Sequence, residues 1–388
     1  MGIISSKQQQ VPSLLTPSME GNLDEVKRLV GIYIADNNTN NNGSKSTLSS
    51  YINTTDASGN AAVHGAVFAG NLDILKFLVE SCCCDDNYGG DDGVDLQLKN
   101  GLGCSPLWIA AGYDRIECLE YLIDKLHNMN QLDVALLDAN STGDTPFVAA
   151  VSRGNINACK CLLSCVEDKK MYKPDDDELA YWDMKCKLLR TSNNSGDTAL
   201  KVAVATGQGK ELVTWLLEED DLCVAAKQHS TTSSSASSSD KDDDVDNPML
   251  TKSVNRKNEA GLSPLIVACE RNLPAIAELL LKHGADLTIK DAKGRNPLSV
   301  ASFCGCDDVV EFLLNKTDAS TLLIDMKDSN GCTPLWLACR TGNLSMVKVL
   351  IDSGADIKVA NNEGLTPQDV ASKFKKDKVV EYFMQTAN

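Results

Sequence analysis

Thr333-Pro334-Leu335-Trp336-Leu337-Ala338 is a phrase of six residues that recurs along this chain of 388 residues. A cap residue and Pro come first, then three residues of which at least one is apolar, then Ala. The other clear copies begin at Ser105, Thr145, Ser263, Asn296 and Thr366, and weaker copies begin at Ala61 and Thr198. A phrase repeated along a chain predicts a solenoid, in which each unit packs only against its neighbours.

Each residue of the phrase has a local role in starting a helix. Ser, Thr or Asn caps the helix by accepting a hydrogen bond from a free backbone N–H, and Pro fits the first helical position. The Ala lies one turn further along on the same face. Eight residues after the Pro position stands a residue suited to a left-handed helix end: Gly70, Asp114, Gly154, Gly207, Asn272, Gly305 and Gly342.

A second helix is predicted directly after this stop. Met346, Val347, Leu350 and Ile351 form an apolar stripe on one face of a helix. Cys118, Leu119, Leu122 and Ile123 repeat that stripe, as do Val309, Val310, Leu313 and Leu314. Turn glycines at 261, 294, 331 and 364 are separated by 33, 37 and 33 residues.

A helix–turn–helix unit of 33 residues with this opening phrase resembles the ankyrin repeat. The resemblance runs from about residue 13 to residue 384, with Gly21–Val30 as the second helix of a degenerate first unit. It implies about nine units. The expected fold is all-α, an ankyrin-repeat solenoid of helix–turn–helix units with β-turn fingers and polar loop insertions.

Composition along the chain predicts four segments. Residues 1–12 form a flexible N-terminal segment, and residues 13–222 form a first block of repeats with insertions. Residues 223–256 form a linker rich in Ser and Asp, expected to be disordered because it cannot bury enough apolar surface. Residues 257–388 form a second block that ends in a polar cap. Whether the stack continues across the linker stays open.

Charge and cysteine content exclude several classes of function. The net charge of −17 is concentrated in insertions, so the chain should repel nucleic acid. Short acidic runs, among them residues 218–221, are interpreted as solvated surface. The 15 cysteines, in a chain without an export signal, indicate reduced thiols and a cytoplasmic location. The chain has no paired CxxC motif that would predict a metal site, and no cofactor is expected. No apolar run reaches the ~18 residues of a membrane helix.

Two sequence signals predict modification. Met1-Gly2 with Ser6 matches the myristoylation pattern, which makes Gly2 a candidate lipid anchor. One acyl chain binds membranes reversibly, so transient membrane association is expected. Ser237 and Ser239 each precede an Asp by three residues, which suits an acidophilic kinase; an inert linker is the open alternative.

The resemblance also implies a binding face. In the resembled family, partners dock on a concave side formed by turn tips and by exposed residues late in the first helix. The corresponding residues here are Phe68, Tyr113, Arg153, Glu270, Arg271, Lys293, Arg295, Phe303 and Arg340. Aromatic residues and Arg are enriched at binding hot spots. The basic residues predict a groove for an acidic peptide, while contact with the neighbouring unit remains an alternative for the aromatic ones.

Other residues in the phrase are interpreted as structural. His64 is expected to form a hydrogen bond between neighbouring units, and Trp108 and Trp336 are expected to pack between units.

These features predict a non-catalytic adaptor that binds another protein. One alternative is a regulatory or inhibitory subunit of an enzyme. A second is an enzyme whose activity lies in the insertions, above all in residues 166–190. The chain has no phosphate-binding loop, GxSxG, HExxH or kinase motif.

Overall fold

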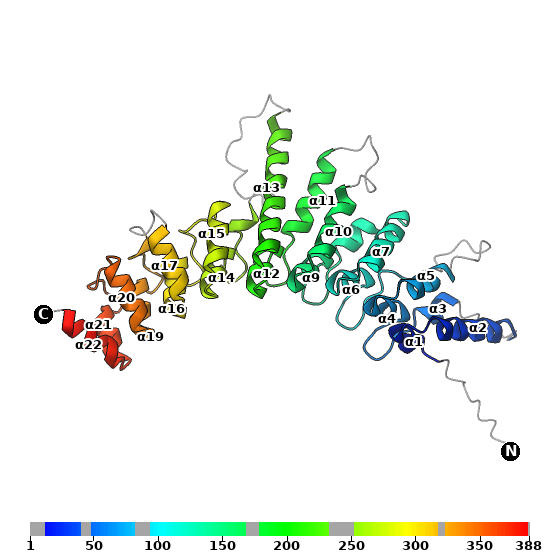
Figure 1. Ribbon diagram of the computed structural model, residues 1–388, viewed down its shortest axis with the longest axis horizontal. Helices are drawn as coiled ribbons and strands as arrows, with labels where there is room; N and C mark the ends of the chain where they lie inside the picture. Colours follow the sequence, from blue (N-terminus) through cyan, green and yellow to red (C-terminus); the bar gives the residue numbers. More distant parts are fainter. Residues whose placement is uncertain are drawn as a thin grey trace, which may run out of the picture. The chain divides into compact units, whose positions relative to one another are not determined.

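The computed structural model describes residues 12–39, 48–81, 94–167, 178–232, 252–316 and 323–386. Gly2, Ser237 and Ser239 lie outside these residues. The described residues form helices joined by turns, without a strand, which confirms the predicted all-α repeat fold (Figure 1). Two compact units are distinguished, residues 1–184 and residues 185–388.

In the first unit, consecutive helices pair. The pairs are α1 (Leu15–Glu20) with α2 (Leu23–Thr39), α4 (Ala62–Ala69) with α5 (Leu72–Ser81), α6 (Pro106–Gly112) with α7 (Ile116–Asn128), and α9 (Pro146–Arg153) with α10 (Ile156–Glu167). We call the first member of each pair the inner helix and the second the outer helix. The inner helices pack in the order α1, α4, α6 and α9. Two short helices, α3 (Leu48–Ile52) and α8 (Leu132–Leu137), stand between pairs.

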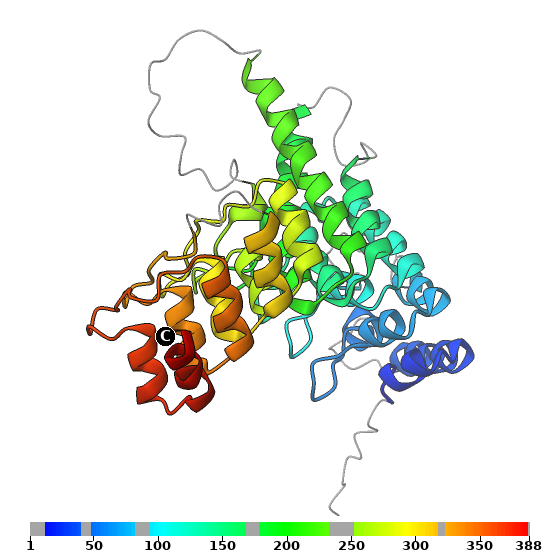
Figure 2. The ribbon, with the colours of Figure 1, turned by 60° about the vertical axis from the view of Figure 1, so that its left-hand side comes forward.

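The second unit begins within α11 (Glu178–Arg190) and continues the same plan. Its pairs are α12 (Ala199–Thr206) with α13 (Lys210–Thr232), α14 (Pro264–Glu270) with α15 (Pro274–Lys282), α16 (Pro297–Cys304) with α17 (Asp307–Lys316), α19 (Pro334–Thr341) with α20 (Leu344–Asp352), and α21 (Pro367–Lys373) with α22 (Asp377–Thr386). Its yellow and orange helices form two layers in Figure 2. With the first unit, the described residues hold nine pairs, as predicted.

The helix ends follow the sequence signals. Ser105 Oγ accepts from the Trp108 backbone N–H at 3.3 Å, and Thr333 Oγ1 accepts from that of Trp336 at 3.2 Å. The predicted stop glycines are left-handed C-caps. Asp114 and Asn272, which replace Gly, have φ values of 55° and 56°. Local hydrogen bonds and backbone preference therefore set the length of the inner helices.

The apolar stripes of the outer helices face the core. On α7, Cys118, Leu119 and Leu122 are at most 1% exposed. On α20, Met346, Val347 and Leu350 are all 0% exposed. Burial of these stripes between neighbouring pairs confirms their prediction and is the main source of stability in such a stack.

Turns project between one pair and the next, and we call them fingers. Neighbouring fingers share a backbone hydrogen bond, as from Ser141 N to Leu102 O at 3.0 Å in the first unit and from Ala292 N to Ala260 O at 3.2 Å in the second. Gly261 has φ +74°, and a Cβ there would lie 2.5 Å from Ala292 N. Only Gly combines that backbone angle with so close an approach.

Part of the predicted linker 223–256 lies within the described residues. Helix α13 continues through residues 223–232, and Lys252 and Ser253 contact it, so both ends of the predicted linker 223–256 belong to the folded stack. Helix α12 packs on α14, and α13 packs on α15, so the stack continues across this stretch. The boundary between the two compact units falls after residue 184.

A buried ion pair explains this continuity. Arg190 Nε lies 2.7 Å from Asp220 Oδ1, with side chains that are 1% and 4% exposed. The backbone N–H of Ser253 donates to Asp220 Oδ2 at 2.8 Å. The carboxylate therefore joins α11, α13 and the one-turn helix η2 (Ser253–Asn255), where the acidic run 218–221 had indicated a solvated surface.

Candidate protein-binding face

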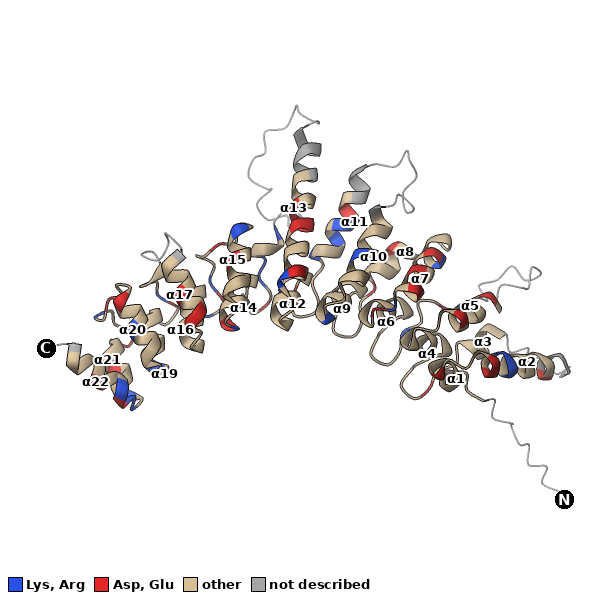
Figure 3. Ribbon diagram, in the orientation of Figure 1, with Lys and Arg blue, Asp and Glu red and all other residues tan. Residues whose placement is uncertain are grey.

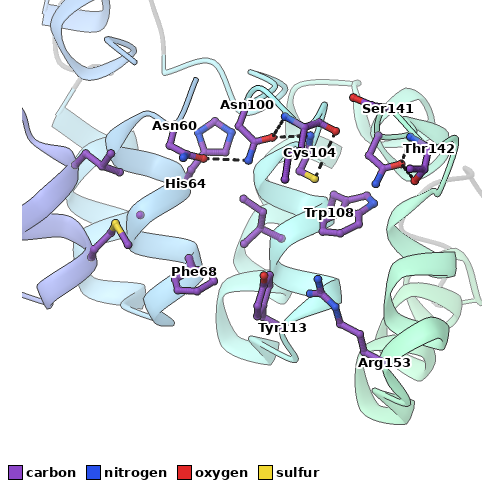
Figure 4. A pocket seen from close by; sticks show the side chains of 16 residues that line it. Asn60, His64, Phe68, Asn100, Cys104, Trp108, Tyr113, Ser141, Thr142 and Arg153 are labelled. Carbon is purple, nitrogen blue, oxygen red and sulfur yellow. Dashed lines mark hydrogen bonds between the residues drawn. The ribbon is translucent and has the colours of Figure 1, made fainter. Parts of the chain in front are cut away.

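Three of the predicted binding residues lie together in the first unit. Phe68, Tyr113 and Arg153 come from the ends of α4, α6 and α9, three inner helices packed in sequence. The rings of Phe68 and Tyr113 meet edge to face, with centroids 4.7 Å apart. The Arg153 guanidinium lies 4.1 Å from the Tyr113 centroid and 5.3 Å from the Trp108 ring (Figure 4).

These residues border a pocket of about 390 Å³ between the fingers and the inner helices. Its apolar lining includes Leu15 and Met19 of α1, Ile109 of α6 and Leu102 of a finger. Several of these side chains remain open to solvent: Phe68 and Tyr113 are 40% exposed, Met19 47% and Leu102 70%. The pocket is thus a largely apolar hollow on the finger side of the inner helices.

Most polar groups at the rim form hydrogen bonds within or between the fingers. Asn100 Nδ2 donates to Asn60 Oδ1 at 3.0 Å, and Asn100 Oδ1 accepts from the backbone N–H groups of Leu102 and Cys104 at 3.0 Å (Figure 4). Asn140 holds the next finger in the same way. These amides shape the rim of the pocket.

His64 and Trp108 have the structural roles that the sequence predicted. The Ala61 backbone N–H donates to His64 Nδ1 at 3.0 Å, so Nε2 carries the proton and donates to Leu98 O of the next unit at 2.9 Å. Burial lowers the pKa of His64, which favours this neutral form. Trp108 is 9% exposed, and its Nε1 donates to Asp144 O at 2.9 Å. Trp336 makes the equivalent bond to Leu365 O at 3.0 Å.

Arg153 gives the pocket its positive charge. One terminal nitrogen donates to Gly112 O at 2.8 Å, which holds the guanidinium at the rim. The described pocket lining contains no Asp or Glu, and neither α4 nor α6 carries a charged residue. Acidic residues gather instead on the outer helices α5 and α7 (Figure 3).

The second unit places the other predicted residues at corresponding positions. Glu270, Arg271, Phe303 and Arg340 stand at or just after the ends of α14, α16 and α19, which pack in that order, and Lys293 and Arg295 belong to a finger. Phe303 is 38% exposed. The side chains at the inner-helix ends therefore occupy equivalent positions in successive units.

Not all of these cations are available to a partner. Arg295 forms an ion pair of 2.7 Å with Asp291, and their side chains are 16% and 2% exposed, so its charge is largely compensated. Arg271, Lys293 and Arg340 have no ion pair among the described residues, and all three are exposed. We call these three residues the basic ridge.

Several residues near the predicted ones were not predicted from the sequence. Leu15 and Met19 belong to a first unit that lacks the opening phrase. Phe374 directly follows α21, the inner helix that begins at the last opening phrase. Phe374 is 45% exposed, with the Arg340 guanidinium 5.5 Å from its ring. Leu102 had a visible signal, because it is a large apolar residue where other fingers have Ser58, Thr142 or Lys293.

The described cysteines are free thiols, and most are buried. Burial raises the pKa of Cys118 to about 11 and that of Cys339 to about 12, so neither forms a thiolate readily. Within the described ranges, no group of His, Cys, Asp and Glu side chains could hold a metal ion. Nor does any described helix combine the length and apolar character needed to cross a membrane.

Comparison with known proteins agrees with the architecture. A family model described as ankyrin repeats (3 copies) matches residues 14–133, 92–173, 130–228, 235–324 and 319–388. The chain is 32% identical over 139 residues to tyrosine-protein kinase HTK16 of Hydra vulgaris, a match that covers 36% of this chain and 18% of the kinase. It is 35% identical over 106 residues to NF-kappa-B inhibitor alpha of Sus scrofa, covering 27% of this chain and 34% of the inhibitor.

A longer match is weaker in identity. The human transient receptor potential cation channel subfamily A member 1 is 24% identical over 362 residues, which is 81% of this chain and 29% of the channel. The chain therefore spans well under half the length of each of these three relatives. The similarity concerns their repeats.

Proposed function

The chain belongs to the ankyrin-repeat family, and we propose that it is a non-catalytic adaptor that binds a partner protein on the finger side of its inner helices. Ankyrin repeats are protein-interaction modules, and most of the family is not catalytic. The proposed location is the cytoplasm. We propose no catalytic role for the insertions, including residues 166–190, whose described part includes α11.

One observation carries this proposal: the open apolar pocket of the first unit. Phe68, Tyr113 and Leu102 all line this pocket and expose large apolar surfaces, although removing such surfaces from water would be favourable. Contiguous apolar surface of this kind marks an interaction site. Aromatic residues with an adjacent Arg have the composition of a binding hot spot.

The basic ridge adds a second contact area for a partner. Three exposed cations without ion pairs in the described chain favour an acidic surface on the partner, because opposite charges speed association and fix its orientation. Glu270, beside Arg271, limits the strength of this attraction.

Affinity purification from cells that make the protein tests this function. Full-length wild type is compared with Tyr113→Ala and with the double variant Arg271→Glu/Arg340→Glu, each checked for folding by circular dichroism. The control is Lys282→Glu on outer helix α15, where the side chain is 66% exposed. We expect a partner that is retained by the wild type and the control and is depleted on one or both face variants. Equal recovery on every variant would contradict the proposed face.

The similarity to an inhibitor supports a second candidate function, a regulatory or inhibitory subunit of an enzyme. The two candidates differ in their effect on the bound partner. A saturating amount of this chain should leave the partner's activity unchanged if it is an adaptor and should lower that activity if it is an inhibitor.

We also propose that acylation of Gly2 recruits the chain to membranes reversibly. The support is the sequence Met1-Gly2 with Ser6, and one acyl chain gives only weak anchoring. Intact mass of protein isolated from its own cells should show an added myristoyl group. An unmodified amino terminus would remove this proposal without affecting the binding face.

A further inference from the structure

We propose that the first-unit pocket binds a peptide segment in which an apolar side chain stands close to a carboxylate. The apolar side chain enters the hollow, and the carboxylate pairs with Arg153. This inference rests on the proposed function, since it assigns a chemistry to the part of the partner that meets the first unit.

The size of the pocket favours a side-chain anchor. Pockets that bury small ligands measure about 300–1,000 Å³, and this one, at about 390 Å³, lies near the lower limit. Met19, Phe68 and Leu102 line the pocket and are partly open to solvent, so an aliphatic or aromatic side chain would cover surface that is now exposed. Trp108 and Ile109 provide a rigid wall, since they are only 9% and 5% exposed.

The charge of the pocket favours a carboxylate as the second group of the ligand. Arg153 is the cation of the described lining, and no carboxylate of that lining compensates it. An occupant with a carboxylate is complementary, whereas a basic occupant would meet Arg153 as a like charge. The positive charge of Arg153 is opposite in sign to the net charge of the chain, which is −17.

The guanidinium is already oriented for such a contact. Its contact with Tyr113, 4.1 Å from the ring centroid, and its bond to Gly112 O at 2.8 Å hold it at the rim. That bond uses one terminal nitrogen, while the structure gives the other terminal nitrogen and Nε no partner in the described chain. Two parallel N–H donors match the two oxygens of a carboxylate.

Gly112 is part of this arrangement. A Cβ on residue 112 would lie 2.8 Å from the nearest terminal nitrogen of Arg153. The long Arg153 side chain can move away from such a contact. Gly112→Ala should therefore displace the guanidinium while it preserves the charge, and Ala is a better helix former than Gly.

Peptide selection on the full-length protein provides the test. A phage library of random 12-residue peptides is selected on the wild type, and the strongest binder is synthesised with its acidic residue intact or changed to the matching amide. Both peptides are titrated calorimetrically into wild type, Arg153→Met and Gly112→Ala. The control is Arg115→Met, because Arg115 also donates to a backbone carbonyl, Phe68 O at 3.0 Å, but does not line the pocket.

On the wild type and on Arg115→Met, the amide peptide should bind about 10- to 100-fold more weakly than the acidic peptide. On Arg153→Met and Gly112→Ala the two peptides should bind almost equally. Thermal melts establish that every variant is folded. If the affinity difference between the two peptides disappears on Gly112→Ala, that difference depends on the position of Arg153 as well as on its charge.

Other outcomes separate this inference from the proposed function. Peptides that bind wild type and Arg153→Met alike, but lose affinity on Arg271→Glu/Arg340→Glu, would overturn the pocket inference and retain the binding face. Selected peptides without a carboxylate would also overturn it. Failure to select any peptide would count against both proposals.

Discussion

Arg190 and Asp220 form an ion pair in the interior of the second unit, 2.7 Å apart and no more than 4% exposed. Asp220 also accepts from the backbone N–H of Ser253 at 2.8 Å and from its hydroxyl at 3.2 Å. Arg256 extends the cluster by donating to Arg190 O at 2.6 Å. The cluster connects residues on both sides of the stretch 233–251.

Removing one partner of this ion pair should destabilise the protein strongly. Asp220→Ala removes the carboxylate that pairs with the buried Arg190 guanidinium, and breaking a buried ion pair from one side costs about 3–5 kcal/mol. Urea unfolding of the full chain, followed by circular dichroism, measures the change. Glu278→Ala is the control, because Glu278 pairs with Lys282 at 3.6 Å on an exposed surface and should contribute less than about 0.5 kcal/mol. Similar losses in the two variants would contradict the structural role of the buried pair.

His64 should make stability depend on pH. Its pKa is lowered in the folded chain by burial, so the unfolded chain binds the proton first as the pH falls. Stability should therefore decrease as the pH drops below about 6.5, the ordinary pKa of His. Urea unfolding at pH 7.5 and pH 5.5 tests this, with His64→Gln showing a smaller decrease than the wild type. An equal decrease in both proteins would exclude His64 as a cause.

Close contact between fingers should make Gly261 intolerant of a side chain. Gly261→Ala requires a left-handed backbone and places Cβ 2.5 Å from Ala292 N, so it should cost about 1–3 kcal/mol or more. Gly209→Ala is the matched control, because no atom lies within 4 Å of the added Cβ. Unfolding measurements on both variants check the difference. Equal stability of the two variants would argue against the finger contact.

Thiol reactivity should follow burial. Cys304 is exposed, whereas Cys269 and Cys339 are 0% exposed. Treatment of the folded protein with N-ethylmaleimide, followed by peptide mapping, should label Cys304 well before the other two. Labelling of all three after unfolding in urea is the control. Early reaction of Cys339 in the folded protein would contradict its position in the core.

The sequence predicted most of the repeat framework because the signals are local. The cap at Ser105, the left-handed end at Asp114 and the buried stripe beginning at Cys118 each depend on residues within about one helix of one another. The acidic run 218–221 was interpreted as solvated, because no local signal reveals that Asp220 meets Arg190 and Ser253 from other elements.

The candidate site was predicted only in part for the same reason. The position of Phe68, Tyr113 and Arg153 followed from the repeat register, since equivalent residues line up along the stack. The pocket itself needs Leu15 and Met19 from a degenerate unit and Leu102 from a finger, so it becomes visible only when the units are packed. The Asp291 ion pair that compensates Arg295 was likewise absent from the prediction.

Site-specific photo-crosslinking tests the proposed binding face most directly. Benzoylphenylalanine replaces Phe68 at the pocket or, in a second protein, Glu117 on the exposed side of outer helix α7. After irradiation in cells, we expect a covalent adduct with a partner protein from position 68 and none from position 117. An adduct from position 117 alone, or equal adducts from both positions, would exclude the proposed binding face.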